Sequence, residues 1–254
     1  MRALPIQARE QERPAAGFGL NPDLDVEGLA AAYAATGRVR IHRFLAEQGL
    51  PEFYDNLCER DDWWHLMNGP DGIVEIDRAT RDGMSEADRR RLDDMVDAGA
   101  RTGFQYRYEG LRVPEGQADP AMGTDPLDAF AELMSSEPML KVLRVITGCG
   151  ALSFTDGQAT AYGPGDFLTR HDDDVPGKNR VAAYVFGLTP NWRPEWGGIL
   201  TFHGSPLEPV IGHVPRFNTL DLFAVPQDHS VSYVSPAAPR RRLAVTGWLR
   251  TGER

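Results

Sequence analysis

A histidine followed by three aspartates, His171-Asp172-Asp173-Asp174, has the clearest capacity for chemistry in this sequence. The preceding residues, "GDFLTR", are typical of a β-strand, in which side chains two apart point to the same face. We therefore expect the imidazole of His171 and the carboxylate of Asp173 to lie together. Asp172 and Asp174 should point away or enter the following turn. A calcium loop beginning at Asp172 is excluded, because its fifth and twelfth positions are a proline and an alanine instead of oxygen ligands.

A second histidine from a distant strand would complete a 2-His-1-carboxylate site. Such a site leaves three positions open on Fe(II) for a bidentate co-substrate and O2. His229, in "FAVPQDHSVSYV", is the preferred candidate, because it begins a predicted strand that should return on the opposite sheet. His213, in a turn flanked by prolines, and His203, in "LTFHGS", remain alternatives. We expect His42 and His65 to be structural.

Four motifs in fixed order resemble the Fe(II)/2-oxoglutarate-dependent oxygenases of the prolyl 4-hydroxylase-like group. They are Y-x-x-G-D-F-L-x-x-H-x-D, GGxLxF, H-x-V-x-x-V and R-x-x-x-x-G-W. In this sequence they occupy Tyr162–Asp173, Gly197–Phe202, His229–Val234 and Arg242–Trp248. The resemblance covers roughly residues 150–250.

The resemblance implies a double-stranded β-helix, or jelly-roll, in which His171, Asp173 and His229 bind Fe(II). It also implies that 2-oxoglutarate chelates the iron and that O2 is consumed, with ascorbate as a candidate reductant. The products would be succinate, CO2 and a hydroxylated substrate. No nucleophile-elbow, phosphate-loop or HExxH motif in the sequence offers a competing chemistry.

The far carboxylate of 2-oxoglutarate would need a fixed cation, and guanidinium binds a carboxylate through two hydrogen bonds. Counting back from the Gly-Trp pair places Arg242 at the family's position. The interval from the distal histidine fits Arg240 better, so Arg240 remains the alternative. We prefer Arg242, because loops absorb insertions whereas a slip of one residue flips every side chain of a strand. Arg241 is expected to be a surface residue, and Tyr162 matches a tyrosine that contacts the co-substrate.

Two positions depart from the family pattern. The family's last strand often carries Arg-x-Ser, and this chain has Ala244 at the serine position. The tyrosine expected before the family's Leu-Asn strand end corresponds here to Phe186 or Gly187. Both departures concern the co-substrate pocket and not the metal ligands.

The resemblance favours a prolyl residue of a protein or peptide as the substrate. A free amino acid or small metabolite is the alternative, and a cupin-like metal protein that does not use 2-oxoglutarate is a further one. The candidate substrate-binding residues are Arg180, nine residues after His171, and the two tryptophans before the "GG" strand, Trp192 and Trp196.

The chain changes character near residue 150. Helical patterns dominate before it, and short strands separated by Gly/Pro turns follow it. We predict a flexible tail over 1–18 and a single domain over 19–254, of class α+β and mainly β. Within that domain, 19–149 should form a helix-rich layer packed on the major sheet, and 150–250 the β-helix core with the metal site.

A formal net charge of −10 argues against binding nucleic acid or an anionic membrane, both of which select basic surfaces. Hydrophobic residues make up 41% of the chain, yet none of their runs approaches membrane-spanning length. The N-terminal segment lacks the apolar stretch of a secretory signal. The two cysteines are far apart and are expected to be reduced thiols, so we predict a cytoplasmic protein. No oligomeric state is indicated.

Overall fold

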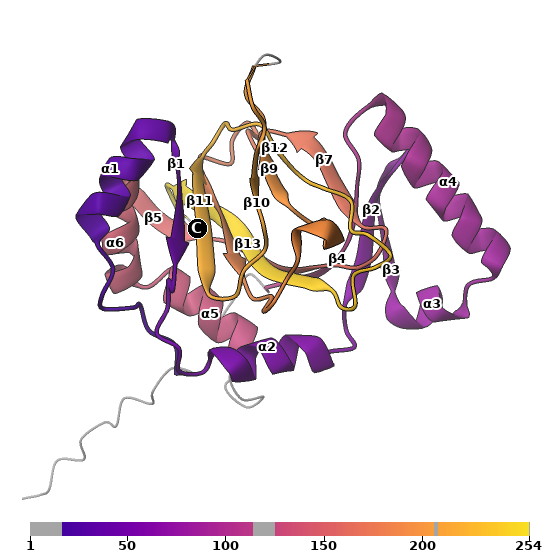
Figure 1. The fold of residues 1–254 in the computed structure, drawn as a ribbon, viewed down its shortest axis with the longest axis horizontal. Helices are drawn as coiled ribbons and strands as arrows, with labels where there is room; N and C mark the ends of the chain where they lie inside the picture. Colours follow the sequence, from indigo (N-terminus) through magenta and orange to yellow (C-terminus); the bar gives the residue numbers. More distant parts are fainter. Residues whose placement is uncertain (1–16, 114–124, 206–207, 254) are drawn as a thin grey trace, which may run out of the picture.

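A computed structural model of the chain describes residues 17–113, 125–205 and 208–253. At its centre an antiparallel sheet curls round on itself, with helices packed outside it (Figure 1). The predicted fold class is therefore confirmed. Residues 1–16 of the predicted tail lie outside the described residues. Phe18, at the end of that prediction, packs on Phe53 with 5.3 Å between ring centroids, so it belongs with the folded part.

The described strands form one sheet with the path β1-β11-β8-β13-β6-β4-β7-β12-β9-β10, to which β2, β3 and β5 attach at the side. The path begins at β1 and ends at β10, so these two strands are its free edges. Their bounds, in chain order, are β1 Arg38–His42, β2 Trp64–Gly69, β3 Gly72–Asp77, β4 Tyr106–Arg112, β5 Leu152–Thr155, β6 Gln158–Tyr162, β7 Phe167–His171, β8 Arg180–Gly187, β9 Leu200–Phe202, β10 Ile211–His213, β11 Thr219–Ala224, β12 His229–Val231 and β13 Arg242–Thr251.

Four strands that precede residue 150 belong to this sheet. β1 pairs with β11, and β4 lies between β6 and β7 in the middle of the path. The β core is therefore not confined to 150–250 as predicted. The alternating patterns of β1 and β4 were visible in the sequence, but their partners lie far along the chain and could not be inferred from local periodicity.

Local sequence signals mark the ends of two helices. Ser85 caps α4 by accepting a hydrogen bond from the backbone N–H of Asp88, and α6 ends at Gly148 in a left-handed conformation. No helix among the described residues is long and apolar enough to cross a bilayer. The helices are α1 Val26–Thr36, α2 Leu50–Glu59, α3 Arg78–Gly83, α4 Glu86–Thr102, α5 Pro126–Met134, α6 Glu137–Thr147 and the short 3-10 turn η1 Pro194–Trp196.

Strand alternation gives the curled sheet an apolar outer face and a more polar interior. On β13, Leu243 and Val245 face outward and pack with the aromatic and aliphatic side chains of the helices. Arg242 and Ala244 alternate with them and therefore face inward. The helical layer thus removes apolar surface from water on one side, and the other side remains available for a polar site.

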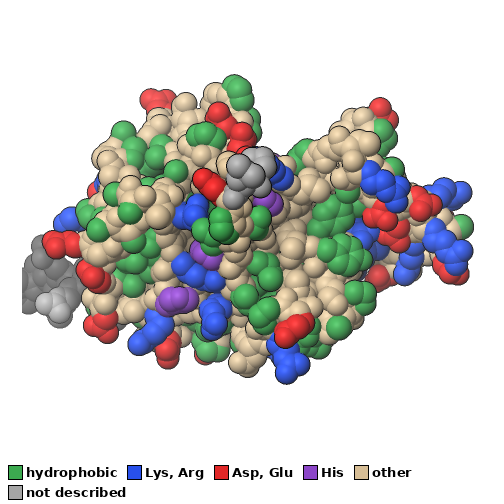
Figure 2. Space-filling model, turned by 45° about the horizontal axis from the view of Figure 1, so that its top comes forward, with side chains coloured by type: hydrophobic (Ala, Val, Ile, Leu, Met, Phe, Trp, Pro, Cys, Tyr) green, Lys and Arg blue, Asp and Glu red, His purple; other side chains and the backbone are tan. Residues whose placement is uncertain are grey.

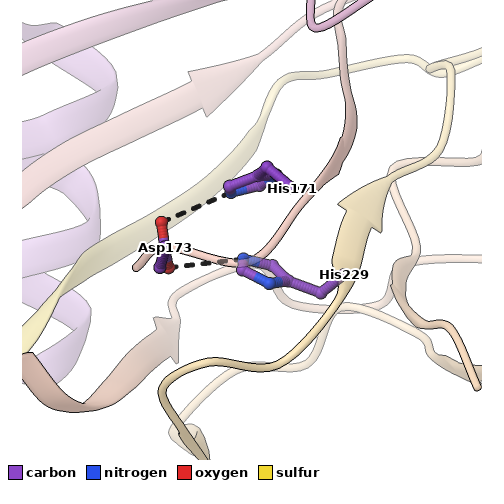
Figure 3. Close-up of side chains that lie close together, drawn as sticks. All are labelled: His171, Asp173 and His229. Carbon is purple, nitrogen blue, oxygen red and sulfur yellow. Dashed lines mark ion pairs between the residues drawn. The ribbon is translucent and has the colours of Figure 1, made fainter. Parts of the chain in front are cut away.

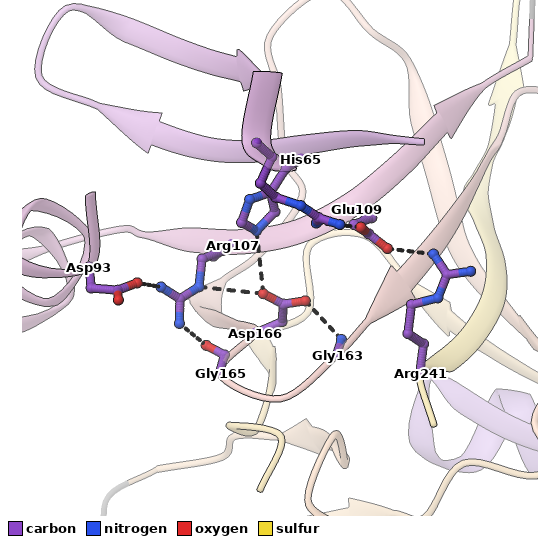
Figure 4. A network of polar contacts seen from close by, with 9 residues as sticks. His65, Asp93, Arg107, Glu109, Gly163, Gly165, Asp166 and Arg241 are labelled. Carbon is purple, nitrogen blue, oxygen red and sulfur yellow. Dashed lines mark hydrogen bonds and ion pairs between the residues drawn. The ribbon is translucent and has the colours of Figure 1, made fainter. Parts of the chain in front are cut away.

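A network of charged side chains lies on the outer side of β4 (Figure 4). Glu109 of β4 is buried and receives hydrogen bonds from the guanidinium groups of Arg81 and Arg241, each over 2.5 Å. Arg241 also lies over the ring of Trp63, 5.1 Å from its centroid. The expectation that Arg241 is a plain surface residue is therefore wrong, because this residue ties the start of β13 to β4.

A second carboxylate of the network organises the loop that leads into β7. Asp166 accepts a hydrogen bond from the backbone N–H of Gly163 over 2.8 Å. Its Oδ1 lies 3.4 Å from Nε of Arg107 and 3.6 Å from Nε2 of His65. His65 is therefore structural, as expected. These contacts hold the loop that precedes β7, the strand that ends at His171 of the predicted site.

We expect Glu109→Gln to destabilise the fold by roughly 2–3 kcal/mol at pH 7, because it leaves two guanidinium groups without their carboxylate. Burial raises the pKa of Glu109, but Arg241 and Arg81 outweigh it, so the pKa lies below its ordinary value of 4.5. The stabilisation is present above the ordinary pKa and is lost as the pH falls through the lowered one.

Urea unfolding at a series of pH values measures this effect. The difference in unfolding free energy between the native chain and the variant should hold from pH 7 down to the ordinary pKa and narrow as the pH falls below it. Glu75→Gln is the matched control, because Glu75 pairs with Arg112 at the surface and its loss should cost under about 1 kcal/mol. Equal losses from both variants would contradict the central role of Glu109.

Candidate metal and co-substrate site

The structure brings His171 and His229 together by direct strand pairing. His171 is the last residue of β7, His229 is the first residue of β12, and the two are cross-strand partners. Their ring centroids are 4.1 Å apart. The expectation that His229 returns on the opposite sheet is therefore wrong: β12 is the hydrogen-bonded neighbour of β7. Direct strand pairing thus brings together two histidines that are 58 positions apart in the sequence.

Asp173 joins the histidines from outside the strand. β7 ends at His171, and Asp173 has a φ of 64°, in the left-handed region. Asp173 thus lies beside the histidines as predicted, but its backbone turn and not strand alternation places it there. Aspartate tolerates this conformation better than most residues. Asp172 is exposed and accepts a hydrogen bond from the backbone N–H of Asp174 over 3.1 Å, which makes the expected turn.

The three side chains form a compact facial set (Figure 3). Nε2 of His171 lies 3.4 Å from Oδ1 of Asp173, and Nε2 of His229 lies 3.5 Å from Oδ2. The ligand atoms all lie within 4.8 Å of one another. Neighbouring ligands of an octahedral ion bound at about 2.1 Å are roughly 3 Å apart. The set therefore fits one metal ion and leaves the opposite face of its coordination sphere open.

Both imidazoles are oriented by their own backbone. Nδ1–H of His171 donates to the carbonyl of Thr169 over 3.0 Å, and Nδ1–H of His229 donates to the carbonyl of Gln227 over 2.7 Å. In each case the acceptor lies two residues earlier. A hydrogen bond at Nδ1 leaves the lone pair of Nε2 for a metal, which is the usual arrangement at metal-ligating histidines.

The electrostatics favour an ionised carboxylate between the rings. Burial raises the pKa of Asp173, but His171 and His229 outweigh it, so the pKa lies below its usual value. Burial and the neighbouring His171 hold the pKa of His229 below its usual value. Burial lowers the pKa of His171, but the Asp173 carboxylate outweighs it and raises the pKa overall. An anionic oxygen beside a neutral imidazole is the donor set that a divalent cation requires.

Arg180, a candidate for contacting substrate, holds Asp173 instead. Its Nη1–H donates to the carbonyl of Asp173 over 3.0 Å. Its guanidinium stacks on the indole of Trp248, 3.6 Å from the ring centroid. The contact fixes the backbone of Asp173 in its left-handed conformation. Arg180 and Trp248 are therefore positioning residues for the carboxylate ligand.

Arg242 is a buried cation that makes no ion pair with any described residue. Its side chain is 3% exposed, and its Nε has no hydrogen-bond partner among the described residues. The guanidinium lies 5.0 Å from the ring centroid of Tyr162, its cross-strand neighbour on β6. Burial lowers the pKa of Arg242. Since a buried unpaired charge is costly, this guanidinium fits an anionic ligand such as the far carboxylate of 2-oxoglutarate.

The other candidates lie elsewhere. Arg240 is exposed and interacts with Tyr54 of α2. Trp192 is buried in an apolar cluster that includes Tyr162, and its Nε1–H donates to the carbonyl of Gly197 over 2.9 Å. Trp196 packs edge-on against Trp192. Trp192 thus packs with Tyr162 in this cluster, whereas Trp196 is only partly buried, so a substrate contact by Trp196 stays a prediction.

The alternative histidines have other partners. Nδ1 of His213 lies 2.8 Å from Oδ1 of Asp221, and Nε2 of His203 lies 2.8 Å from Oγ of Ser230. Neither belongs to the cluster that could hold a metal. His229 is therefore the histidine that the fold places beside His171 and Asp173.

Sequence reasoning did not identify an aromatic ladder beside the metal cluster. Phe104, Tyr106 and Tyr108 occupy alternate positions on and before β4. Successive ring centroids are 5.6 and 5.4 Å apart, and Tyr108 stacks on Tyr162 at 5.2 Å. Phe104 is 48% exposed and lies 5.4 Å from the ring of His171. The alternation in "FQYRY" was the available signal, but nothing local showed that it faced the site.

Residues 157–250 match the model of the 2OG-Fe(II) oxygenase superfamily. No curated protein matches the chain in sequence. The structure resembles a prolyl-4-hydroxylase of Pseudomonas putida, with 19% identity, a TM-score of 0.57, and coverage of 90% of this chain and 100% of that one. These findings confirm the predicted resemblance to oxygenases of the prolyl 4-hydroxylase-like group.

Two further structures show the range of proteins with this fold. A prolyl hydroxylase of Trichoplax adhaerens, in complex with a hypoxia inducible factor peptide, is 15% identical with a TM-score of 0.58, and 89% of each chain is covered. The α-ketoglutarate-dependent epimerase SnoN from nogalamycin biosynthesis is 12% identical with a TM-score of 0.54. The match covers 89% of this chain and 83% of SnoN. At these identities the likeness establishes the fold alone.

We expect Asp173→Asn to weaken binding of Fe(II) at least about 100-fold, because the only anionic ligand of the set is lost. Asp172→Asn, one position earlier and exposed, should bind the ion as the native chain does. Anaerobic titration calorimetry with Fe(II), or with Mn(II) as an air-stable substitute, measures both. Equal losses from the two variants would show that the wrong carboxylate has been assigned.

Proposed function

Since residues 157–250 match the model of the 2OG-Fe(II) oxygenase superfamily, we propose that this chain is an Fe(II)- and 2-oxoglutarate-dependent hydroxylase of a prolyl residue in a protein or peptide. The observation that carries the proposal is that one curled sheet holds a facial His-Asp-His set and a buried arginine, Arg242, whose Nε has no hydrogen-bond partner among the described residues. A metal set alone would suit many proteins. The buried cation adds a requirement for an anionic ligand inside the same sheet.

In this proposal His171, Asp173 and His229 hold Fe(II), and Arg242 binds the far carboxylate of 2-oxoglutarate. Tyr162 interacts with both the arginine and the metal cluster. The Arg242 guanidinium lies over its ring, and the charge of Asp173 contributes to the raised pKa of its hydroxyl. Burial raises the pKa of Tyr162 far above its usual value, so the hydroxyl stays protonated and can donate a hydrogen bond to the co-substrate.

The bound ion and co-substrate would supply an oxidative decarboxylation, in which 2-oxoglutarate and O2 give succinate and CO2 and one C–H bond of the substrate becomes C–OH. The protein would orient the reactants and exclude water. Arg180 keeps Asp173 in place, and the backbone hydrogen bonds keep both Nε2 atoms directed at the ion. Burial of His229 and Tyr162 would keep water away from this side of the metal cluster.

The aromatic ladder supports a ring-shaped apolar target on a polypeptide. It runs from the exposed ring of Phe104 beside His171 to the buried ring of Tyr162. A pyrrolidine ring packs well against aromatic faces, and the exposed end leaves room for chain on either side. The alternative substrate is a free amino acid or small metabolite. The likeness to SnoN, an α-ketoglutarate-dependent epimerase, favours keeping it.

Arg242→Gln should abolish 2-oxoglutarate binding while Fe(II) still binds, because only the buried cation is removed. We expect the dissociation constant to rise at least about 100-fold, since a charge-assisted bidentate pair is lost from a buried site. Anaerobic titration of Fe(II) protein with 2-oxoglutarate, followed by the metal-to-ligand charge-transfer absorption, measures this.

Arg240→Gln is the matched control, and it should titrate as the native chain does. Loss of the absorption in Arg240→Gln instead would reassign the co-substrate arginine. Absence of any charge-transfer absorption in the native chain would contradict 2-oxoglutarate dependence and favour a metal-binding protein of another class.

Phe104→Ala should raise KM for a proline-containing peptide about tenfold with little change in kcat, because the ring would contact substrate outside the reacting centre. Peptide-dependent succinate formation measures both constants. Ile73→Ala is the control, because Ile73 is 60% exposed on β3 and does not belong to the ladder. Saturation by free proline, with no gain from a peptide, would favour the small-molecule alternative.

A further inference from the structure

Five basic side chains gather along the seam between the two edges of the sheet. Arg38, Arg40 and His42 occupy alternate positions of β1 and share one face, and His213 of β10 and Arg216 lie beside them. Figure 2 shows Lys/Arg and His side chains, in blue and purple, in a line on this side of the molecule. We call these residues the basic stripe. It is a local excess of positive charge in a chain whose formal net charge is −10.

The stripe has one carboxylate among its described contacts. Asp221 lies 3.4 Å from Nε of Arg40 and 2.8 Å from Nδ1 of His213. Arg38 makes no ion pair with a described residue and instead lies over the ring of Phe202, 5.2 Å from the centroid. Arg216 is exposed and likewise makes no ion pair within the described part of the chain. Within the part of the chain that the structure describes, these two guanidinium charges have no counter-ion.

The field along the stripe is correspondingly positive. Burial lowers the pKa of His42, and the nearby charges of Arg40, Arg216 and His213 lower it further, with Asp221 opposing them. Arg40 is held in place because its Nη2–H donates to the carbonyl of Val214 over 2.6 Å. Arg38, Arg40 and His42 are thus fixed to a strand, whereas Arg216 lies in the connection between β10 and β11.

One end of the stripe adjoins the metal cluster. Phe202, which Arg38 covers, is the cross-strand partner of His229 in the β9–β12 pair. Phe202 also contacts Phe223, whose ring lies 4.7 Å from that of His229. From this end the stripe runs along β1 to His42. A substrate that reaches the metal could therefore lay a neighbouring segment along the stripe.

We propose that the basic stripe binds an acidic, extended segment of the polypeptide substrate, next to the residue that is hydroxylated. This inference rests on the proposed function. Side chains on one face of β1 recur every ~6.6 Å, and carboxylates at alternate positions of an extended peptide have the same spacing. β1 also begins the strand path among the described residues, so it has an edge beside which an extended chain can lie.

The test uses two fluorescein-labelled decapeptides, each with one proline followed by alternating glutamates or alternating glutamines. We expect the full-length protein to bind the glutamate peptide about tenfold more tightly at low salt, with the difference shrinking as salt is added. Fluorescence anisotropy measures the affinities without iron or 2-oxoglutarate. Arg38→Glu/Arg216→Glu should remove the preference. Arg90→Glu/Arg91→Glu makes the same charge change on exposed residues of α4, on the other side of the molecule, and should keep it.

Three results would overturn the inference: equal affinity for both peptides, a preference that survives in the stripe variant, or displacement by inorganic phosphate far beyond the effect of sodium chloride at equal ionic strength. The last would indicate a small-anion site.

Circular dichroism melting confirms that both double variants fold. Failure of the Fe(II) and 2-oxoglutarate titration would reject the proposed function alone, whereas a normal titration without peptide discrimination would reject the stripe alone. In turnover, the glutamate peptide should have the lower KM and an unchanged kcat.

Discussion

Pairing of β7 with β12 is the contact on which the candidate site depends. It makes His171 and His229 direct neighbours, and each ring is aimed by a hydrogen bond to the backbone two residues earlier. Asp173 then needs only to fold back across the end of β7. Neighbouring parts of the molecule support that pairing. Asp166 holds the loop that leads into β7, and β9 pairs with the other edge of β12.

The curled sheet separates two kinds of environment by strand alternation. Its outer face buries apolar side chains against the helices, and that burial is the main source of stability. Its inner face carries groups that are costly to desolvate, such as Arg242 and Asp221. A polar interior of this kind persists because the outer face stabilises the sheet, and it prepares the protein to bind charged ligands.

Much of the site could be predicted from the sequence, because motif order carries information that local patterns lack. His171, Asp173 and His229 lie together as the motifs suggested, and Tyr162 and Arg242 are cross-strand neighbours. The route to Asp173 could not be foreseen, since strand alternation gives no warning of a left-handed residue after a strand end. The contacts of Arg180 and Arg241 were also invisible, because each joins segments far apart in the chain. The strands β1 and β4 were recognisable, but their place in the sheet was not.

The backbone hydrogen bonds at the two histidines have a consequence for the protein without its ion. Each ring is held in its metal-ready tautomer by the chain itself, so the ligand geometry does not have to be assembled at the moment of binding. Little conformational entropy is then lost on loading, in contrast to small zinc domains that fold only with their metal. For the proposed iron site, removal of the ion by a chelator should accordingly leave the fold intact, so that reloading would depend on the supply of the ion and not on refolding.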